Sequence, residues 1–205
     1  MKRKQFIALL IVGLISGLTL QSAQAVKPRT RGKSAPTPAA ALTEAEASDL
    51  LFMREEEKLA RDVYVILYAE WGVRAFNNIS RSEQRHMDAV LGLLNKYGLT
   101  DPTLESGQFA EEELQDLFDT LKAKGLQSEL DALRVGALIE EVDMEDIALA
   151  MQRTDKSDII SVYINLMKGS ENHLNAFVKN IESITGEPYV AQWISQEDVD
   201  AILGR

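Results

Sequence analysis

The run from Phe76 to Tyr97 carries the pattern that most restricts how this chain can fold. An α-helix advances by about 100° per residue, so side chains three and four positions apart share one face. One such face holds Phe76, Ile79, Glu83, His86, Met87, Val90, Leu94 and Tyr97. The apolar members predict that this face packs against a core, and Glu83 and His86 then point inward together. A carboxylate is rarely buried unless it is paired or binds a metal ion.

The whole chain predicts an all-α protein, because helical periodicity recurs along it and strand signals are nearly absent. The expected long helices span residues Thr43–Trp71, the run ending at Tyr97, Ala110–Lys124, Ser128–Val142 and Ser157–Ser183. Thr43 and Glu46 have the spacing of a capping box at the start of the first helix. Gly72, Gly98, Gly125 and Gly186 are expected to end helices.

Three smaller features complete the predicted architecture. The polar pair Asn77–Asn78 is expected to form a break before the second helix. Residues Asp143–Gln152 are expected to form a separate short helix, with Thr154 and Asp155 capping the last long one. The tail Tyr189–Leu203 contains aromatic and apolar residues and is expected to pack back over the helices as a C-terminal helical tail.

The first 25 residues have the composition of a secretory signal peptide. Basic residues Lys2–Lys4 precede an apolar run, Phe6–Leu20, and the small-residue site Ala23–Ala25 follows it. The apolar run is shorter than the roughly 18 residues that favour a membrane span, although an uncleaved anchor is the alternative. Residues 26–47 are proline-containing and predict a flexible linker before a helical domain, 48–205. We therefore expect export to the periplasm or the extracellular space, without stable membrane insertion after cleavage.

Composition excludes several classes of function. The chain has no cysteine, which rules out disulfides, thiolate metal sites and a rubredoxin module. Glycine-rich phosphate loops, nucleophile elbows and zinc-protease motifs are absent from the sequence. The net charge of −10 includes the basic residues 1–34, so that residues 35–205 carry −17. This acidity disfavours nucleic acid as a partner and favours cations, although solubility alone is the other explanation.

The candidate site consists of polar groups that the helical projection places on inward faces. Glu83 and His86 lie on the second helix, and the others come from the remaining long helices: Glu56, Glu140, Ser170 and His173. The projection puts Glu56 near the centre of its face and Glu57 well off it. In helical bundles such groups recur as a carboxylate-bridged site for two metal ions. Buried hydrogen-bonded pairs, without metal, are the alternative.

Four motifs resemble one known family. They are Arg54–Tyr64 (REEEKLARDVY), Ser82–Met87 (SEQRHM), Asp131–Gly136 (DALRVG) with Ile139–Glu141 (IEE), and Asn172–Leu174 (NHL). They resemble the domain-of-unknown-function family 2202 (DUF2202), which is grouped with the ferritin-like superfamily, over a core of residues 48–184. The resemblance implies a ferritin-like four-helix bundle with additional short helices. It also implies metal-ligand places for Glu56, Glu83, His86, Glu140 and His173, but no established reaction.

One position departs from the superfamily pattern. A Glu-x-x-His pair on the last long helix would need glutamate at position 170, and this chain has Ser170. The site is therefore expected to hold one or two divalent ions, iron or manganese. Glu57, or a water molecule held by Ser170, is expected to fill the gap.

Three functions follow from these patterns. The first is an exported redox protein that binds iron or manganese and acts on oxygen, peroxide or the metal itself. The second is a metal-binding or buffering domain without catalysis. The third is a helical interaction module that has lost its metal site and binds a partner through the tail around Trp193. The sequence patterns do not distinguish an enzyme from a non-catalytic protein, and they are compatible with a monomer and with a homo-oligomer.

Overall fold

The computed structural model describes residues 41–205, and all regular secondary structure within this range is helical. The six helices of this range are α2 (Glu44–Trp71), α3 (Arg74–Tyr97), α4 (Glu112–Gly125), α5 (Glu129–Met151), α6 (Ser157–Thr185) and α7 (Gln196–Leu203). The all-α prediction is thus confirmed. The predicted signal peptide, 1–25, and residues 26–40 of the predicted linker lie outside the described residues.

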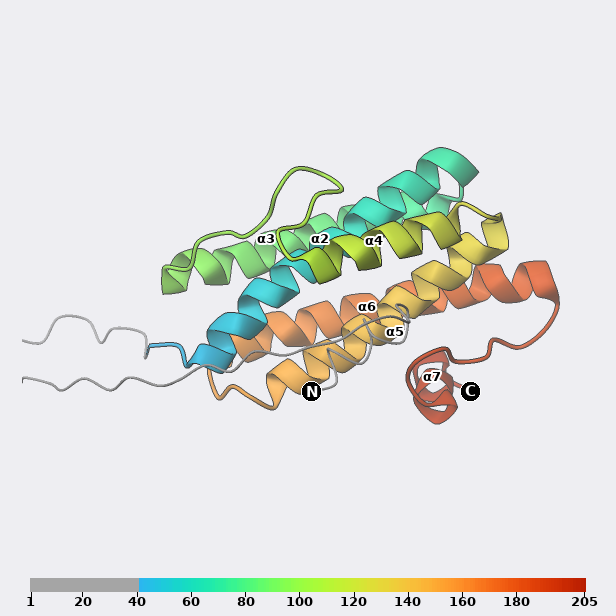
Figure 1. Cartoon of the computed structure of the whole chain (residues 1–205). Coiled ribbons are helices and arrows are strands. Elements are labelled where there is room, and N and C mark those ends of the chain that lie inside the picture. Colours follow the sequence, from blue (N-terminus) through green and yellow to red (C-terminus); the bar gives the residue numbers. More distant parts are fainter. Residues whose placement is uncertain (1–40) are drawn as a thin grey trace, which may run out of the picture. The chain divides into compact units, whose positions relative to one another are not determined.

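The long helices pack as two pairs. Helix α2 lies along α3, and α5 lies along α6 (Figure 1). Contacts of α2 with α5 and of α3 with α6 join the pairs, while α4 packs on both α2 and α5. Between residues 41 and 205, the helices are all too short or too polar to cross a membrane.

Most predicted helix ends are confirmed. Thr43 Oγ1 accepts a hydrogen bond from the Glu46 backbone N–H over 3.2 Å, and Glu46 Oε2 accepts one from the Thr43 N–H over 2.8 Å. This capping box starts α2 at Glu44, so the folded region begins before residue 48. Gly72 and Gly186 follow α2 and α6 with φ of 67° and 70°, a left-handed conformation that glycine adopts at little cost.

Two predicted interruptions of helices are wrong. Asn77 and Asn78 lie inside α3, since the weak helix propensity of asparagine costs little against the burial of Phe76 on the same turn. The separate short helix Asp143–Gln152 does not exist, because α5 continues unbroken to Met151. Neither glycine nor proline interrupts the chain there, and buried residues such as Ile147 extend the inward face.

Gly125 does end α4, but the reason is packing rather than a left-handed turn. The residue is still helical, and the following Leu126 keeps right-handed helical angles. A Cβ atom at position 125 would lie 2.7 Å from Leu67 Cδ2. Glycine at this position therefore lets the end of α4 approach α2 closely.

Two apolar regions flank a polar layer in the interior. One region is a cluster formed by α2, α3, α5 and α6: Leu50, Met53, Val90, Leu93, Leu94, Ile147, Ala150, Ile159, Tyr163 and Leu166. The other contains Tyr64, Phe76 and Phe177, whose ring centroids lie 5.3–5.9 Å apart. Along α2, Glu57 lies between Met53 of the apolar cluster and Tyr64 of the aromatic group. On α6, His173 likewise lies between Leu166 and Phe177. The polar layer therefore lies between apolar walls, where electrostatic interactions are strong.

Helix α2 buries charges on more than one side. Lys58, only 1% exposed, donates to Asp62 Oδ2 over 2.8 Å and to the backbone oxygen of Gln108 over 3.0 Å. Arg54 pairs with Asp101 over 2.8 Å. These contacts hold the connection between α3 and α4 against α2. Buried charge on this helix is therefore not by itself a sign of a metal site.

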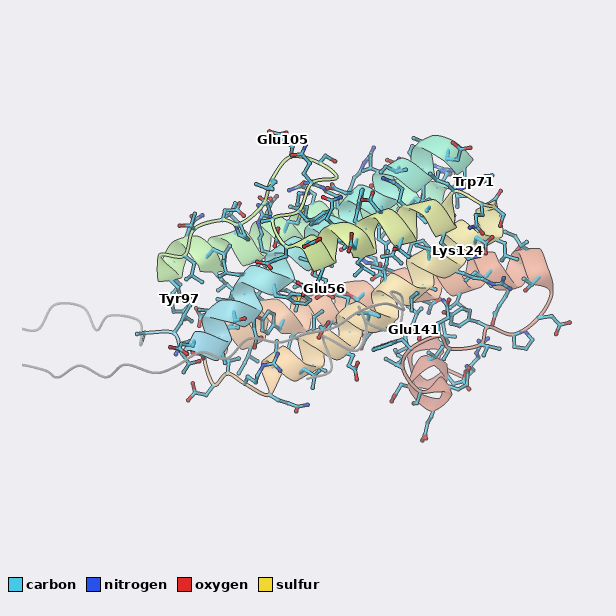
Figure 2. The ribbon with its side chains drawn as sticks, in the orientation of Figure 1. Glu56, Trp71, Tyr97, Glu105, Lys124 and Glu141 are labelled. Atoms are coloured by element: carbon cyan, nitrogen blue, oxygen red, sulfur yellow. The ribbon has the colours of Figure 1, made fainter. Side chains whose placement is uncertain are left out.

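The C-terminal tail packs back as predicted, and Glu141 of α5 holds it (Figure 2). The fully buried carboxylate of Glu141 accepts hydrogen bonds from the backbone N–H groups of Gln192, Trp193 and Ile194 over 2.5–3.2 Å. The hydroxyl of Tyr189 donates to the same carboxylate over 2.6 Å. Glu141 thus has a structural role, although it is adjacent to the candidate ligand Glu140.

Candidate metal centre

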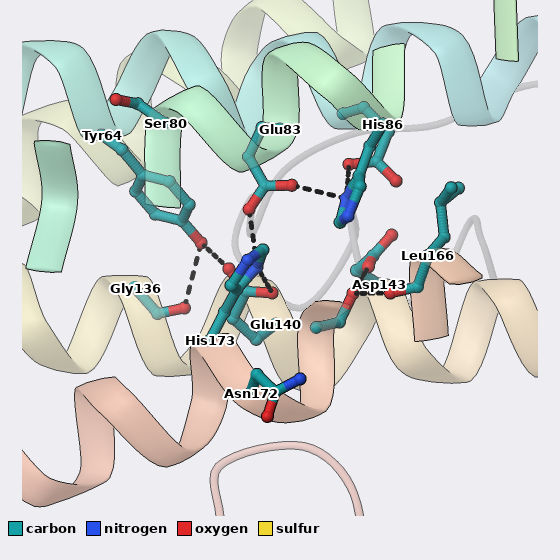
Figure 3. A network of polar contacts seen from close by, with 12 residues as sticks. Tyr64, Ser80, Glu83, His86, Gly136, Glu140, Asp143, Leu166, Asn172 and His173 are labelled. Carbon is teal, nitrogen blue, oxygen red and sulfur yellow. Dashed lines mark hydrogen bonds and ion pairs between the residues drawn. The ribbon is translucent and has the colours of Figure 1, made fainter. Parts of the chain in front are cut away.

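Five ionisable side chains from four helices meet in the polar layer. Helix α2 contributes Glu57, α3 contributes Glu83 and His86, α5 contributes Glu140, and α6 contributes His173 (Figure 3). The three carboxylates are 2% exposed, and the two imidazoles 7–9%. The i, i+3 spacing on α3 places Glu83 and His86 on one face, as the sequence predicted.

These side chains form two groups that share one member. Ligand atoms of Glu57, Glu83 and His86 lie within 4.8 Å of one another, and so do those of Glu83, Glu140 and His173. Both groups combine carboxylate oxygens with one imidazole nitrogen. Glu83 belongs to both, which makes it the central residue of the cluster.

The two oxygens of Glu83 face different histidines. Oε2 lies 2.8 Å from His86 Nδ1, and Oε1 lies 2.8 Å from His173 Nδ1. Each Nδ1 also faces a second carboxylate, at 3.2 Å for Glu57 and 3.3 Å for Glu140. The imidazole rings stack with centroids 5.5 Å apart. Two positions for a cation are thus related through one carboxylate.

The surroundings strongly shift the pKa values of the central residues. Burial disfavours the charged imidazoles, but hydrogen bonds and charges from neighbouring carboxylates outweigh it and raise the pKa of His86 to about 11 and that of His173 to about 10. Burial also disfavours charge on Glu83, yet hydrogen bonds from both histidines lower its pKa to about 2. The site therefore favours positive charge on either side of Glu83.

The outer carboxylates shift the other way. Burial raises the pKa of Glu57 well above its usual value, and the charge of nearby Asp143 adds to this effect. Burial likewise raises the pKa of Glu140. Asp143, on the same turn of α5, has a pKa of about 7 because burial and the charge of Glu140 both disfavour its ionised form. More carboxylates are gathered here than two imidazolium ions stabilise.

Neighbouring residues fix the orientation of the candidate ligands. Tyr64 donates a hydrogen bond to Glu140 Oε1 over 2.6 Å. Gly169 allows the His86 ring to lie against α6, because a Cβ atom there would overlap the ring. Gly136 on α5 lies against Phe177, whose ring would lie 2.6 Å from an added Cβ atom.

The structure brings together Glu83, His86, Glu140 and His173 as the sequence predicted, but it exchanges the roles of two residues on α2. Glu57 joins the cluster, whereas the half-buried Glu56 belongs to neither group. The projection of Glu57 away from the inward face is therefore wrong. Because α3, α4 and α5 all contact α2, this helix has no single apolar face from which a projection could be made. The face toward the site is rotated by about one residue step, roughly 100°.

Asp143 is a further member of the polar layer that was not among the residues predicted from the sequence. It is 5% exposed, and its Oδ2 accepts a hydrogen bond from the fully buried Ser170 over 2.5 Å. The signal was the i, i+3 spacing from Glu140, which places both on one helical face. The expected helix boundary at Val142 concealed that spacing.

Comparisons with known proteins agree with the resemblance inferred from the motifs. A family model described as "Uncharacterized protein domain (DUF2202)" matches residues 46–205. The chain is 46% identical over 164 residues to the uncharacterized protein MJ0754 of Methanocaldococcus jannaschii. The aligned region covers 79% of this chain and 88% of that protein. A crystal structure of hypothetical protein MJ0754 is similar, with a TM-score of 0.78, 45% identity, and coverage of 83% of this chain and 98% of that one.

Proposed function

The chain belongs to the DUF2202 family of uncharacterized domains, and we propose that it binds two divalent metal ions, iron or manganese, in its polar layer. The observation that carries this proposal is the position of Glu83, whose two oxygens each lie 2.8 Å from a different histidine. A carboxylate in this arrangement can bridge two cations, with one imidazole nitrogen available to each. The protons on the two Nδ1 atoms would then be replaced by metal ions.

The chemistry of the donors fits such ions. Carboxylate oxygens with a few imidazole nitrogens are typical ligands of iron and manganese in helical proteins. Glu57 Oε1 is buried and makes no hydrogen bond to any residue between 41 and 205, so it has a lone pair directed into the protein without a donor. A cation held by Glu57, Glu83 and His86 would satisfy that atom.

The order of the ligands supports membership of the ferritin-like superfamily. Glu57 on α2, the Glu83–His86 pair on α3, Glu140 on α5 and His173 on α6 follow the pattern of a ferritin-like four-helix bundle. In this proposal α2, α3, α5 and α6 are the four helices of the bundle. Ser170 occupies the place of the glutamate that usually precedes the last histidine by three residues.

The proposed activity is redox chemistry on oxygen, peroxide or the metal itself. Bound iron or manganese would supply the electrons and open coordination positions. The protein's contribution is to hold the ions between apolar walls and to orient the ligands, as Tyr64 does for Glu140. The two imidazoles, 7–9% exposed, are the least buried of the five candidate ligands.

Metal buffering without catalysis is the second candidate. The acidic balance of residues 35–205, −17 overall, favours it because such a surface attracts cations. Both functions need the same site, so turnover distinguishes them. Oxygen or peroxide consumption by the iron-loaded protein would support the redox function, and stable binding without consumption would support buffering. Absence of binding would leave the interaction module as the remaining interpretation.

Metal analysis of the reconstituted protein tests the proposal. After loading with Fe²⁺ under anaerobic conditions or with Mn²⁺, the wild type is expected to retain two ions per chain through gel filtration. Glu83→Gln removes the shared charge and should abolish retention of at least one ion. Glu55→Gln is the matched control, because Glu55 is similarly buried, 4% exposed, but belongs to neither group. Equal metal content in the two variants would contradict the proposed site.

A further inference from the structure

Asp143 is a buried carboxylate with only one of its oxygens in a hydrogen bond. Ser170 donates to Oδ2 over 2.5 Å, whereas Oδ1 is buried and makes no hydrogen bond to the part of the chain that the structure describes. A buried polar atom without a hydrogen-bond partner is destabilising, because it has lost its contacts with water. The side chain is 5% exposed and lies in the polar layer, close to His86 and Glu140 (Figure 3). It therefore directs an unused acceptor into the candidate site.

The position of Asp143 along α5 matches one of the two groups. Three residues of helix rise by about 4.5 Å, which is close to the separation of 3.5–4 Å in sites with two metal ions. Glu140 is paired with His173. Asp143 lies three residues further along α5. It accepts a hydrogen bond from Ser170, and the neighbouring residue, Gly169, is in contact with the His86 ring. Asp143 is thus on the His86 side of the cluster.

Electrostatic contacts agree with this placement. The charge of Asp143 acts on Glu57, and His86 and Glu83 are in turn among the charges that act on Asp143. Glu57, Glu83 and His86 are the three residues of the first group. Asp143 therefore interacts with the members of the first group, although it is not one of its three residues.

Charge balance also calls for a fourth carboxylate. Two divalent cations carry four positive charges, and histidines that bind metal are neutral. Glu57, Glu83 and Glu140 supply three negative charges. An uncompensated charge between apolar walls would be costly, and the ionised Asp143 compensates it.

We propose that Asp143 is a metal ligand that binds through Oδ1 to the ion held by Glu57, Glu83 and His86. Ser170 is then a positioning residue, since its hydroxyl holds Oδ2 and turns Oδ1 toward the ion. A carboxylate from α5 thereby takes over the function of the glutamate that position 170 lacks. This inference rests on the proposed metal site, but it concerns a residue that neither the motifs nor the two groups include.

Manganese binding by four variants tests the inference. Asp143→Asn should weaken binding of one of the two Mn²⁺ ions by more than about 100-fold, beyond the 10–100-fold that loss of an outer-shell partner causes. Electron paramagnetic resonance should then lose the exchange-coupled signal of a bridged pair. The matched control is Asp146→Asn, since Asp146 is also buried on α5, 8% exposed, and belongs to neither group. It should retain both ions.

The remaining variants separate the two proposals. If Glu83→Gln loses metal while Asp143→Asn binds as Asp146→Asn does, the metal site stands and Asp143 is not a ligand. If wild type and Glu83→Gln both bind no metal, the proposed function fails. If Asp143→Asn does not fold, Ser170→Ala tests the inference in its place. Without the Ser170 hydroxyl the Asp143 carboxylate is no longer held, and the affinity for one of the two ions should fall by about 10–100-fold. Unchanged binding in a folded Ser170→Ala protein would overturn the inference.

Discussion

The hydroxyl group of Tyr64 donates a hydrogen bond to Glu140 Oε1 over 2.6 Å. Burial, with the charge of Glu140, raises the pKa of Tyr64 well above its ordinary value, so the group remains a donor at all physiological pH values. The hydrogen bond occupies one oxygen of Glu140 and leaves Oε2 facing His173 at 3.3 Å. Tyr64 thus determines which oxygen of Glu140 is available to a cation.

Replacing Tyr64 by phenylalanine should weaken metal binding while preserving the fold. The phenyl ring keeps the contacts with Phe76 and Phe177, but Glu140 loses its orienting donor. Loss of such an outer-shell partner typically lowers metal affinity by about 10–100-fold. Isothermal titration with Mn²⁺ measures the change. Tyr163→Phe, at a similarly buried tyrosine in the apolar cluster, is the control and should bind as wild type does.

Stability of the chelator-treated protein should decrease as pH rises above about 6.5. His86 and His173 have pKa values raised from 6.5 to about 11 and about 10, so the folded state holds more protons than the unfolded chain between these limits. Their contribution is complete below pH 6.5 and is lost as pH rises toward 10–11. Asp143, with its pKa raised to about 7, further lowers the free energy of unfolding as pH rises from 4 to 7. Glu83 has a pKa lowered to about 2, so its contribution to the free energy of unfolding is lost as pH falls below 4.5.

Urea unfolding at several pH values should therefore show a maximum near pH 4.5, because Asp143 lowers the free energy of unfolding above that pH and the two histidines lower it further above pH 6.5. The decline above pH 6.5 should be smaller in His86→Gln, which lacks one of the two imidazoles. A free energy of unfolding that rises between pH 6.5 and 9 would contradict the assignment of charge to the histidines.

Metal binding should have the opposite dependence on pH. Each ion must displace the proton of an imidazole, so affinity for Mn²⁺ is expected to rise as pH increases from 6 to 9, with protons released on binding. Titration calorimetry in buffers of different ionisation enthalpy counts those protons. Binding without proton release would show that the two histidines are not ligands.

Helix α3 could be predicted from the sequence because only one of its faces is buried. Its stripe alternates with exposed residues, and the projection correctly places Glu83 and His86 inward. Helix α2 offered no such contrast. Lys58 and Asp62 on it are buried as an ion pair beneath the connection to α4, so polarity did not mark its exposed side. Choosing between Glu56 and Glu57 required the positions of the neighbouring helices.

Asp143 could not be assigned for a different reason. A run of acidic residues from Glu140 to Asp146 resembles the exposed start of a new helix. In the structure these residues point in different directions: Glu141 binds the tail, while Glu140 and Asp143 face the polar layer. Which side each carboxylate faces depends on α6 and on the tail, neither of which is encoded locally.

Glu141 is predicted to stabilise the tail without affecting metal content. Glu141→Ala would leave several backbone N–H groups of residues 192–194 without an acceptor, and we expect a loss of about 3 kcal/mol in the free energy of unfolding. Hydrogen exchange at these amides should accelerate. Glu145→Gln, which weakens the 2.8 Å hydrogen bond from Trp193 Nε1, is the milder control and should cost about 1 kcal/mol. Both variants should still bind two ions at saturating Mn²⁺.

Gly169 is predicted to be required for the position of His86. In Gly169→Ala the added methyl group would overlap Cε1 and Nε2 of the imidazole, so the ring must move away from α6. Such overpacking costs about 1–3 kcal/mol, and displacement of Nδ1 from Glu57 and Glu83 should weaken the ion on that side. Urea unfolding and Mn²⁺ titration measure the two effects.

Gly92 provides the comparison for Gly169 because it lies in α3 with no atom within 4 Å of an added Cβ. Gly92→Ala should stabilise the protein by about 0.5–1 kcal/mol through helix propensity alone and leave metal binding unchanged. If Gly169→Ala gave the same gain in stability and bound two ions as tightly as wild type, the close contact between the His86 ring and α6 would not matter for the site. The opposite signs expected for the two alanine variants make this the most direct test of how α6 positions His86.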